Sequence, residues 1–370
     1  MPALKKEHGL SGGQAGAIFG IAILTFTITM IFAGRIQQTR GPRPVAATGA
    51  LLFGAGYLLA GLSDGSFPAL LASLGLLVGT GTGFGYVCPL ATCVRWFPKH
   101  KGLVTGVAVA GFGGGAILLS GIAGRFLAEN VPVLEIFRWV GVWYGLAALA
   151  GALALRFPEP AHSSSEPLIP LRALLGIREF RGLAAGMFAG TFGGLLIVGN
   201  LGPIGLAKDL TDAQAVLGIQ LRALGNAAGR ISWGWLYDRI GRPVLPISLV
   251  ALLISISSLG LSSSAAAFHA MAVLTGFCFG ACFVLYAAET ASIFGHQRLG
   301  STYPFIFLAY GLSGLIGPAL GGWINDQTGS FKPAIMVTAL IILVGTAIVW
   351  HTKPAGETSA SLLKLKIEEA

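Results

Sequence analysis

The sequence predicts an all-α integral membrane protein, in which helices cross the bilayer. Only 11% of its 370 residues are charged, against roughly 25% in soluble proteins, while 54% are hydrophobic and the mean hydropathy is +0.77. Most apolar residues fall in blocks of ~20, long enough for a helix to cross a hydrocarbon core of ~30 Å. The blocks are apolar on every side and do not alternate, so they indicate helices and exclude barrel strands.

Apolar blocks between charged breaks predict eleven transmembrane helices. We expect them at Gly12–Gly34, Pro44–Leu62, Phe67–Val94, Gly102–Arg125, Phe137–Leu155, Gly182–Leu206, Ala213–Leu236, Val244–Leu261, Phe268–Glu289, Tyr303–Trp323 and Pro333–Trp350. A break rich in proline, serine and charge separates the fifth helix from the sixth. We therefore predict a five-helix bundle over 1–157, a cytoplasmic linker over 158–181, a six-helix bundle over 182–353 and a cytoplasmic tail over 354–370.

The positive charges predict the orientation in the membrane. Of the 24 Lys and Arg residues, sixteen fall in connections on one side of the spans and six on the other. An excess of positive charge in short loops marks the cytoplasmic side, so the linker and the C-terminus are expected inside. Residues 1–10 are typical of a connector between helices. We therefore expect that the first helix of a set of twelve is missing, and that the full set forms two repeats of six.

The remaining composition excludes several other kinds of site. The net charge of +9 is explained by the cytoplasmic loops, so no nucleic-acid partner is expected. Four cysteines lie inside apolar blocks without a histidine at ligand spacing, so we interpret them as reduced core residues and expect no metal and no cofactor. The 55 glycines allow helices to approach each other closely in a bilayer.

The most specific motif is GWLYDRIGR, from Gly234 to Arg242, in the connection between the second and third spans of the second bundle. It resembles the loop signature of the major facilitator superfamily, G-x-L-x-D-R-x-G-R, at every defined position. The resemblance implies the major facilitator fold and a conformational role for Gly234, Asp238, Arg239, Gly241 and Arg242. As an acid at a helix end, Asp238 can engage the N-terminus of a neighbouring helix or an arginine. The corresponding stretch of the first bundle, Gly34–Arg43, is degenerate.

Further motifs narrow the family. The string WFPKHKGLVTGVAVAGFGGG, from Trp96 to Gly115, resembles the fifth-helix signature of monocarboxylate transporters and of the related oxalate:formate antiporters. Similar stretches recur in the second half, at Gly199–Gly205, Gly225–Arg242 and Ala309–Gly322. The resemblance covers most of the chain and implies a transporter of small carboxylate anions, not an enzyme.

Three polar residues spaced by four form a stripe on the predicted helix Ala213–Leu236. Arg222, Asn226 and Arg230 together drift only ~80° around that helix. An arginine inside a span costs ~2.5 kcal/mol or more, so it is expected to face a cavity, a partner or a ligand. A planar guanidinium can offer two N–H donors to one carboxylate, and the stripe therefore predicts binding of a small organic anion. The competing interpretation is that Arg230 extends toward the cytoplasm, since it lies about a turn from the loop.

The family resemblance assigns roles within and near this stripe. It places the substrate-binding arginine at Arg230, whereas Arg222 matches no family position. Asn226 stands where some monocarboxylate transporters carry a proton-handling aspartate, which leaves proton coupling through this helix open. Tyr310 stands where the oxalate-exchanging relative has a second cation, a lysine. A site with one dedicated cation is a better electrostatic match for a monoanion than for a dianion.

Four further residues are candidates for the site. Tyr86 is expected to face the same central region and could donate its hydroxyl to a carboxylate, although a tyrosine at the membrane interface is the competing interpretation. Tyr286 and Asn200 are candidates of the same kind. Glu289 is an acid near the cytoplasmic end of a span, and it is either a structural group or a proton-coupling site.

These observations predict a secondary transporter that moves small monocarboxylate anions by alternating access, either with protons or in exchange for another anion. It is expected to be a monomer that crosses the plasma (cytoplasmic) membrane several times, with a cytoplasmic C-terminus. Two alternatives remain. One is a major facilitator exporter of drugs or other organic solutes, and the other is a non-transporting membrane sensor.

Overall fold

The computed structural model describes residue 4, residues 7–158 and residues 168–352, and within these ranges it contains helices and no strand. The chain divides into two compact units. The first unit runs up to Trp96 and resumes from Gly114 to the linker, and the second comprises Phe97–Gly113 together with the chain after the linker. The boundaries predicted from the sequence for the two bundles stay a prediction. Residues 159–167 of the predicted linker and the whole predicted tail lie outside the described residues.

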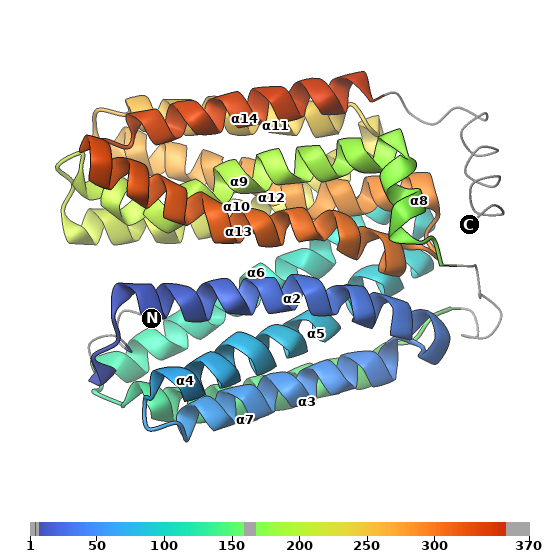
Figure 1. Cartoon of the computed structure of the whole chain (residues 1–370), viewed down its shortest axis with the longest axis horizontal. Coiled ribbons are helices and arrows are strands. Elements are labelled where there is room, and N and C mark those ends of the chain that lie inside the picture. Colours follow the sequence, from blue (N-terminus) through green and yellow to red (C-terminus); the bar gives the residue numbers. More distant parts are fainter. Residues whose placement is uncertain (1–3, 5–6, 159–167, 353–370) are drawn as a thin grey trace. The chain divides into compact units, whose positions relative to one another are not determined.

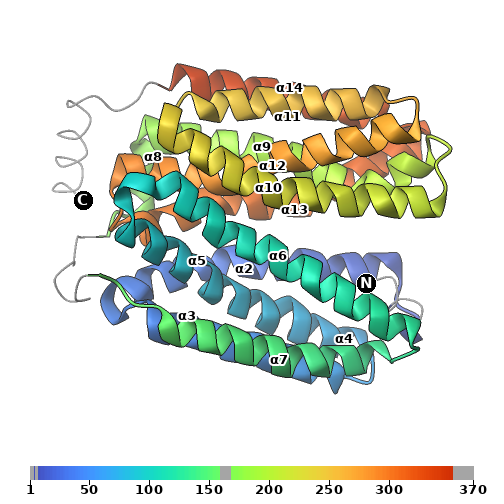
Figure 2. The same ribbon diagram turned by 180° about the vertical axis from the view of Figure 1, so that it is seen from behind.

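The first unit is built from long helices joined by short turns (Figure 1). These are α2 (Gly12–Arg40), α3 (Pro42–Gly61), α5 (Gly79–Trp96) and α7 (Val133–Ala154), with α5 reached from α4 (Phe67–Leu70) through the π-helical segment η1 (Leu71–Val78). Helix α6 (Lys101–Ala128) runs through the division between the units at Gly114. Helices α3 and α7 lie side by side in both views (Figure 2).

The second unit contains six long helices and one short one. These are α8 (Leu171–Gly176), α9 (Arg178–Leu206), α10 (Asp212–Ile240), α11 (Val244–Leu261), α12 (Ala265–Phe294), α13 (Leu299–Thr328) and α14 (Lys332–His351). Helix α10 makes its largest contact with α12, and α9 with α13. Helix α9 begins at Arg178, four residues before the predicted span, so its first turn lies in the segment predicted as linker.

The start and end of α10 follow from local sequence. Thr211 and Gln214 form a capping box, in which the Thr211 hydroxyl accepts from the Gln214 backbone N–H at 3.3 Å and the Gln214 amide oxygen accepts from the Thr211 N–H at 3.0 Å. The helix ends at Gly241, whose φ of +75° is a backbone conformation that favours glycine. These two signals fix the length of the helix that carries the polar stripe.

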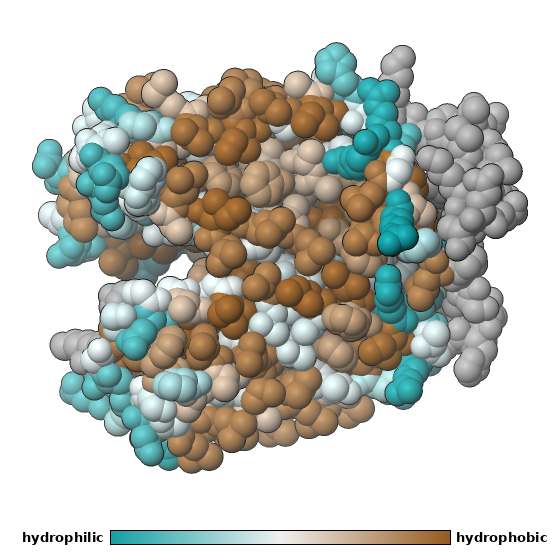
Figure 3. All heavy atoms as spheres, viewed as in Figure 1, coloured by the Kyte–Doolittle hydropathy of each residue, from teal (hydrophilic) through white to brown (hydrophobic). Residues whose placement is uncertain are grey.

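Nine helices in the described part of the chain are long and apolar enough to cross a membrane. Helices α6 and α10 are not among them, and α10 is the helix with two arginines and an asparagine near its middle. The expected eleven spans and the expected missing first helix therefore stay predictions. On the face of the second unit shown in Figure 3, hydrophobic residues cover the middle of the helices and hydrophilic residues gather at their ends. On α14, the apolar side chains of Met336 and Leu340 are exposed.

Candidate functional site

Glycines bring α10 and α12 into backbone contact. A Cβ atom on Gly225 would lie 2.1 Å from a carbonyl oxygen of α12, and one on Gly229 would lie 2.1 Å from the Phe277 carbonyl oxygen. From the other side, a Cβ on Gly276 would lie 2.0 Å from the Arg222 carbonyl oxygen. Small residues spaced by four allow this approach in helices that cross a membrane. The close crossing sets which α12 side chains the polar stripe of α10 can reach.

Arg230 is buried, with 6% of its surface exposed. Its guanidinium carbon lies 4.7 Å from the centre of the Phe283 ring on α12, and its Nη1 donates a hydrogen bond to the Val109 carbonyl oxygen on α6. Gly113 of α6 lies beside the same nitrogen, since a Cβ there would be in van der Waals contact with Nη1 at 3.7 Å. Arg230 therefore does not extend to the surface, and the aromatic ring and the carbonyl together orient its guanidinium plane.

Arg222 lies two turns before Arg230 and makes a parallel contact. Its guanidinium carbon is 5.8 Å from the centre of the Phe279 ring, and Phe279 and Phe283 contact edge to face at 5.1 Å. Nη1 of Arg222 is buried and has no hydrogen-bond partner within the described residues. The two arginines of the stripe thus stack on neighbouring rings of α12. Phe279 and Phe283 were not predicted from the sequence, although their spacing of four on an apolar helix was a usable signal.

Tyr310 joins the same aromatic row from α13. Its ring centre lies 5.3 Å from that of Phe283 and 5.0 Å from that of Phe307. Phe283 therefore contacts both the Arg230 guanidinium and the Tyr310 ring. This arrangement places Tyr310 beside the aromatic rings that contact the two arginines of the stripe, Arg222 and Arg230. We call these three residues with Phe279 and Phe283 the arginine–aromatic cluster.

The two asparagines hydrogen-bond to helix backbones. The Asn226 side-chain amide donates to the Gly276 carbonyl oxygen at 3.3 Å, across the α10–α12 crossing. The Asn200 amide donates to the Leu196 carbonyl oxygen at 2.9 Å and to the Pro318 carbonyl oxygen at 3.2 Å, which joins α9 to α13. Each amide therefore stabilises a contact between two helices of the second unit.

The other two tyrosines lie in separate surroundings. Tyr86 belongs to the first unit and contacts Phe26 edge to face, with ring centres 5.3 Å apart. Tyr286 is fully buried, and its hydroxyl has no hydrogen-bond partner within the described residues. A Cβ on Gly186 of α9 would lie 2.6 Å from that hydroxyl, so the Tyr286 ring fills the space between α12 and α9.

Asp238 of the loop motif caps the N-terminus of α6. Its two carboxylate oxygens accept from the backbone N–H groups of Gly102 and Leu103, both at 2.7 Å. The first N–H groups of a helix have no partner inside the helix and carry a partial positive charge, so an acid there is favoured. Gly234 permits the contact, because a Cβ there would lie 2.3 Å from the Gly102 carbonyl oxygen.

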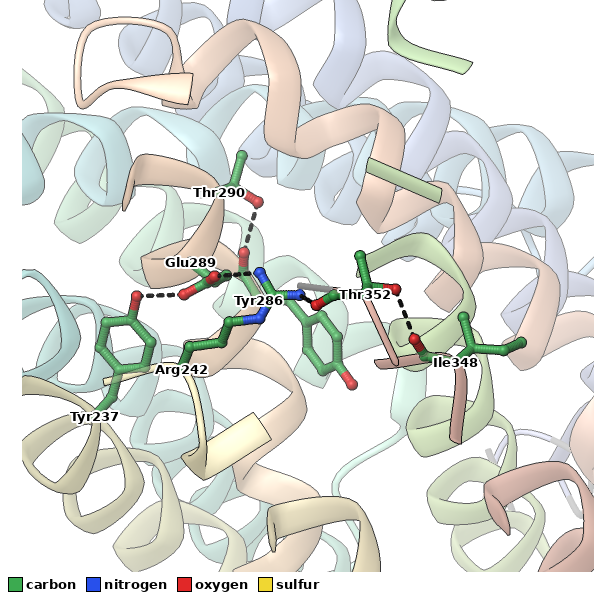
Figure 4. Close-up of polar contacts among 7 residues, drawn as sticks. All are labelled: Tyr237, Arg242, Tyr286, Glu289, Thr290, Ile348 and Thr352. Carbon is green, nitrogen blue, oxygen red and sulfur yellow. Dashed lines mark hydrogen bonds and ion pairs between the residues drawn. The ribbon is translucent and has the colours of Figure 1, made fainter. Parts of the chain in front are cut away.

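Arg242 and Glu289 form a buried ion pair at the same end of α10, with Nη1 and Oε1 2.9 Å apart (Figure 4). The Tyr237 hydroxyl donates to the second carboxylate oxygen of Glu289 at 2.6 Å. The Arg242 guanidinium also donates to the Thr352 carbonyl oxygen, just after α14. Glu289 and Arg242 therefore join α10, α12 and the end of α14. Their further partners, Tyr237 for Glu289 and Thr352 for Arg242, were not predicted from the sequence.

The remaining loop residues differ in exposure and contact. Arg239 is exposed, with its guanidinium carbon 3.9 Å from the centre of the Trp235 ring. Gly241 ends α10, and its N–H donates to the Tyr237 carbonyl oxygen at 2.7 Å. Among the described residues, no group of three His, Cys, Asp or Glu side chains could hold a metal ion.

Comparison with known proteins identifies the family. A family model described as the Major Facilitator Superfamily matches residues 1–219 and 183–366. The oxalate:formate antiporter of Oxalobacter formigenes is 30% identical over 344 residues, which cover 89% of this chain and 80% of that protein. Monocarboxylate transporter 11 of Mus musculus is 28% identical, covering 94% of this chain and 80% of that protein.

A solved structure shares the fold at low sequence identity. The Escherichia coli fucose:proton symporter superposes with a TM-score of 0.74 at 16% identity, covering 96% of this chain and 94% of that chain. Together with the matched family model and the apolar helices, this likeness confirms the predicted class of fold. The chain is a multi-pass membrane transporter, not an enzyme, and it belongs to the Major Facilitator Superfamily.

Proposed function

We propose that the protein is a secondary transporter of small monocarboxylate anions, of the size of lactate, pyruvate or formate, and that Arg230 binds the carboxylate. Transport would proceed by alternating access, in which the site opens to one side of the membrane at a time. The observation that carries this proposal is the arginine–aromatic cluster, in which Arg230 is buried against Phe283 beside Tyr310. The relatives named as an oxalate:formate antiporter and a monocarboxylate transporter support the same substrate class.

The chemistry of Arg230 suits a carboxylate. A buried guanidinium is costly unless a ligand or partner stabilises its charge, and an aromatic ring contributes only ~0.5–2 kcal/mol of that stabilisation. The ring and the Val109 carbonyl hold the guanidinium plane in one orientation. A carboxylate in that plane would accept two parallel hydrogen bonds, which provides direction as well as charge.

Tyr310 and Arg222 would set selectivity around Arg230. A tyrosine hydroxyl can donate to a carboxylate or a keto oxygen without adding charge, so Tyr310 favours a monoanion. Arg222 adds a second positive charge further along the stripe and increases the attraction for an anion before it binds. Asn226 and Asn200 would act indirectly, by keeping the helices of the cluster in register, while Tyr86 and Tyr286 remain candidates for lining the substrate path.

Two coupling modes are consistent with the proposal, proton symport and anion exchange. Glu289, the acid considered for proton coupling, is held by Arg242 and Tyr237, which supports a structural role. We further propose that Asp238, Gly234 and Arg242 stabilise one conformation from the cytoplasmic side, through the contacts with α6 and α12. The proposed topology has the predicted eleven spans and bundle boundaries. It places the protein in the plasma membrane, with the C-terminus on the cytoplasmic side.

Uptake into proteoliposomes tests the proposal. The purified protein would be given labelled lactate, pyruvate, acetate, formate and oxalate, with and without a pH gradient, and with and without internal anion. We expect uptake of monocarboxylates over oxalate, driven by one of the two gradients. No uptake of any of these anions, together with transport of uncharged or cationic organic solutes, would contradict the proposal.

A further inference from the structure

A groove of about 390 Å³ lies on the second unit, away from the arginine–aromatic cluster. Its walls come from the last third of α10, the start of α6 and the middle of α12. The wall residues that matter here are almost all apolar: Leu103, Ile231, Ser232, Trp235, Leu236 and Phe277. Ile231 and Trp235 are 42% and 45% exposed, so this face of α10 is open to its surroundings rather than covered by protein.

Positive charge stands at one end of the groove. Arg239 follows Ser232 and Trp235 on the same face of α10, at spacings of seven and four, and its guanidinium stacks on the Trp235 ring at 3.9 Å. The exposed residues Lys99 and His100 come directly before α6. They lie at the level of Arg239, because the neighbouring Asp238 carboxylate binds the first N–H groups of α6.

Two acids, Glu289 and Asp238, act on Lys101 at this rim, and Glu289 is paired with Arg242. Both oxygens of Asp238 already accept backbone N–H bonds from α6. Lys101 adds a further positive charge, with its Nζ 6.0 Å from the centre of the Tyr237 ring. The rim therefore favours an anion, whereas the groove next to it favours a hydrocarbon.

The dimensions fit a lipid. Ile231 precedes Arg239 by eight residues, which is ~12 Å along a helix at 1.5 Å per residue. An amphiphile with its anionic group at Arg239 would thus place the first part of an acyl chain along Trp235 and Ile231. The volume is within the range of ~300–1,000 Å³ that is typical of small-molecule sites.

We propose that this groove is a binding site for one anionic phospholipid, with its phosphate at Arg239 and the Lys99–Lys101 turn and an acyl chain against Trp235 and Ile231. This proposal is independent of the substrate that the protein transports. A general excess of positive loop charge would attract anionic lipid diffusely, whereas the groove predicts one lipid held at a defined place.

Native mass spectrometry of the purified chain tests the proposal. The protein in detergent is titrated with phosphatidylglycerol or phosphatidylcholine that carry the same acyl chains. We expect one phosphatidylglycerol to remain bound where phosphatidylcholine does not. Arg239→Gln should weaken that binding about fivefold, the effect of ~1 kcal/mol for one basic residue near a lipid headgroup. The matched control is Arg43→Gln, an exposed arginine in the first turn of α3 in the first unit, which should leave the binding unchanged.

A second variant tests the groove itself. Ile231→Trp keeps every charge but fills the groove, and it should weaken binding at least as much as Arg239→Gln. Glycerophosphoglycerol, the headgroup without chains, should not compete. The proposal is overturned by equal retention of the two lipids, by equal effects of Arg239→Gln and Arg43→Gln, by full competition from the headgroup alone, or by a second copy of the chain occupying the face in place of lipid.

Discussion

Charged side chains in the middle of α10 and at its C-terminal end have different contacts. At the end, protein groups neutralise the charges, since Asp238 binds the N-terminus of α6 and Arg242 pairs with Glu289. In the middle, the guanidinium groups of Arg222 and Arg230 lie over the rings of Phe279 and Phe283, and Arg230 also donates to the Val109 carbonyl oxygen. The ion pair and the helix cap at the end hold helices together, whereas for the two arginines in the middle we propose a role in binding an anion.

The largest effect is expected from replacing Arg230, in the middle of α10, because this should reduce transport. Arg230→Lys keeps the positive charge but loses the planar pair of donors, so transport should fall by about 30- to 150-fold, equivalent to ~2–3 kcal/mol for a lost charge-assisted hydrogen bond. The measurement is kcat/KM for monocarboxylate uptake in proteoliposomes. Arg43→Lys, at an exposed position in the first turn of α3, serves as the control and should behave as the wild type. Normal uptake by Arg230→Lys would shift the role to Arg222.

Removing the charge of Glu289 should instead disrupt the ion pair at the end of α10 and lower the stability of the fold. Glu289→Gln keeps a hydrogen-bond acceptor for Tyr237 but leaves Arg242 uncompensated, and we expect a loss of about 2 kcal/mol in the free energy of unfolding. The thermal midpoint in detergent should fall by several degrees, while the affinity for the anion stays the same. An unchanged midpoint together with loss of pH-driven uptake would make Glu289 a proton-coupling residue.

A change in anion selectivity would test whether Tyr310 belongs to the binding site. Tyr310→Lys adds a cation beside Phe283, which should offset part of the desolvation cost of a second carboxylate. Competition by oxalate or malonate against a labelled monocarboxylate should improve on the order of tenfold, the effect of ~1.4 kcal/mol. Tyr310→Phe is the matched variant without added charge and should not improve it. An unchanged competition profile in the lysine variant would place Tyr310 outside the site.

The smallest effect is expected from the helix cap. Asp238→Ala removes the acceptor for two N–H groups of α6 and should cost about 1 kcal/mol. Asp238→Asn retains an acceptor and should recover part of that loss, which separates hydrogen bonding from charge. Thermal unfolding of both variants provides the comparison. Equal losses in the two variants would mean that the negative charge, rather than the hydrogen bonds, stabilises the N-terminus of α6.

Much of the fold could be predicted because its signals are local. Blocks of apolar residues indicate helices without knowledge of their neighbours, and Asp238 at a helix end was correctly expected to engage a neighbouring helix or an arginine. The arginine stripe was visible because its spacing is a property of one helix.

Contacts between helices could not be predicted from the sequence as readily. The pairing of Arg222 with Phe279 and of Arg230 with Phe283 depends on the register of α10 against α12. That register is set by backbone contacts at Gly225, Gly229 and Gly276, and no single helix reveals it. Asn226 was predicted to bind substrate because it belongs to the polar stripe of α10. Its hydrogen bond to α12 could not be predicted, because that contact depends on the register of the two helices.

The most direct test of the contrast within α10 is equilibrium binding of a labelled monocarboxylate to the purified protein, measured side by side for Arg230→Lys and Glu289→Gln. We expect the affinity to fall at least tenfold in Arg230→Lys and to stay within about twofold of the wild type in Glu289→Gln. The opposite pattern, with binding kept in Arg230→Lys and lost in Glu289→Gln, would contradict this expectation.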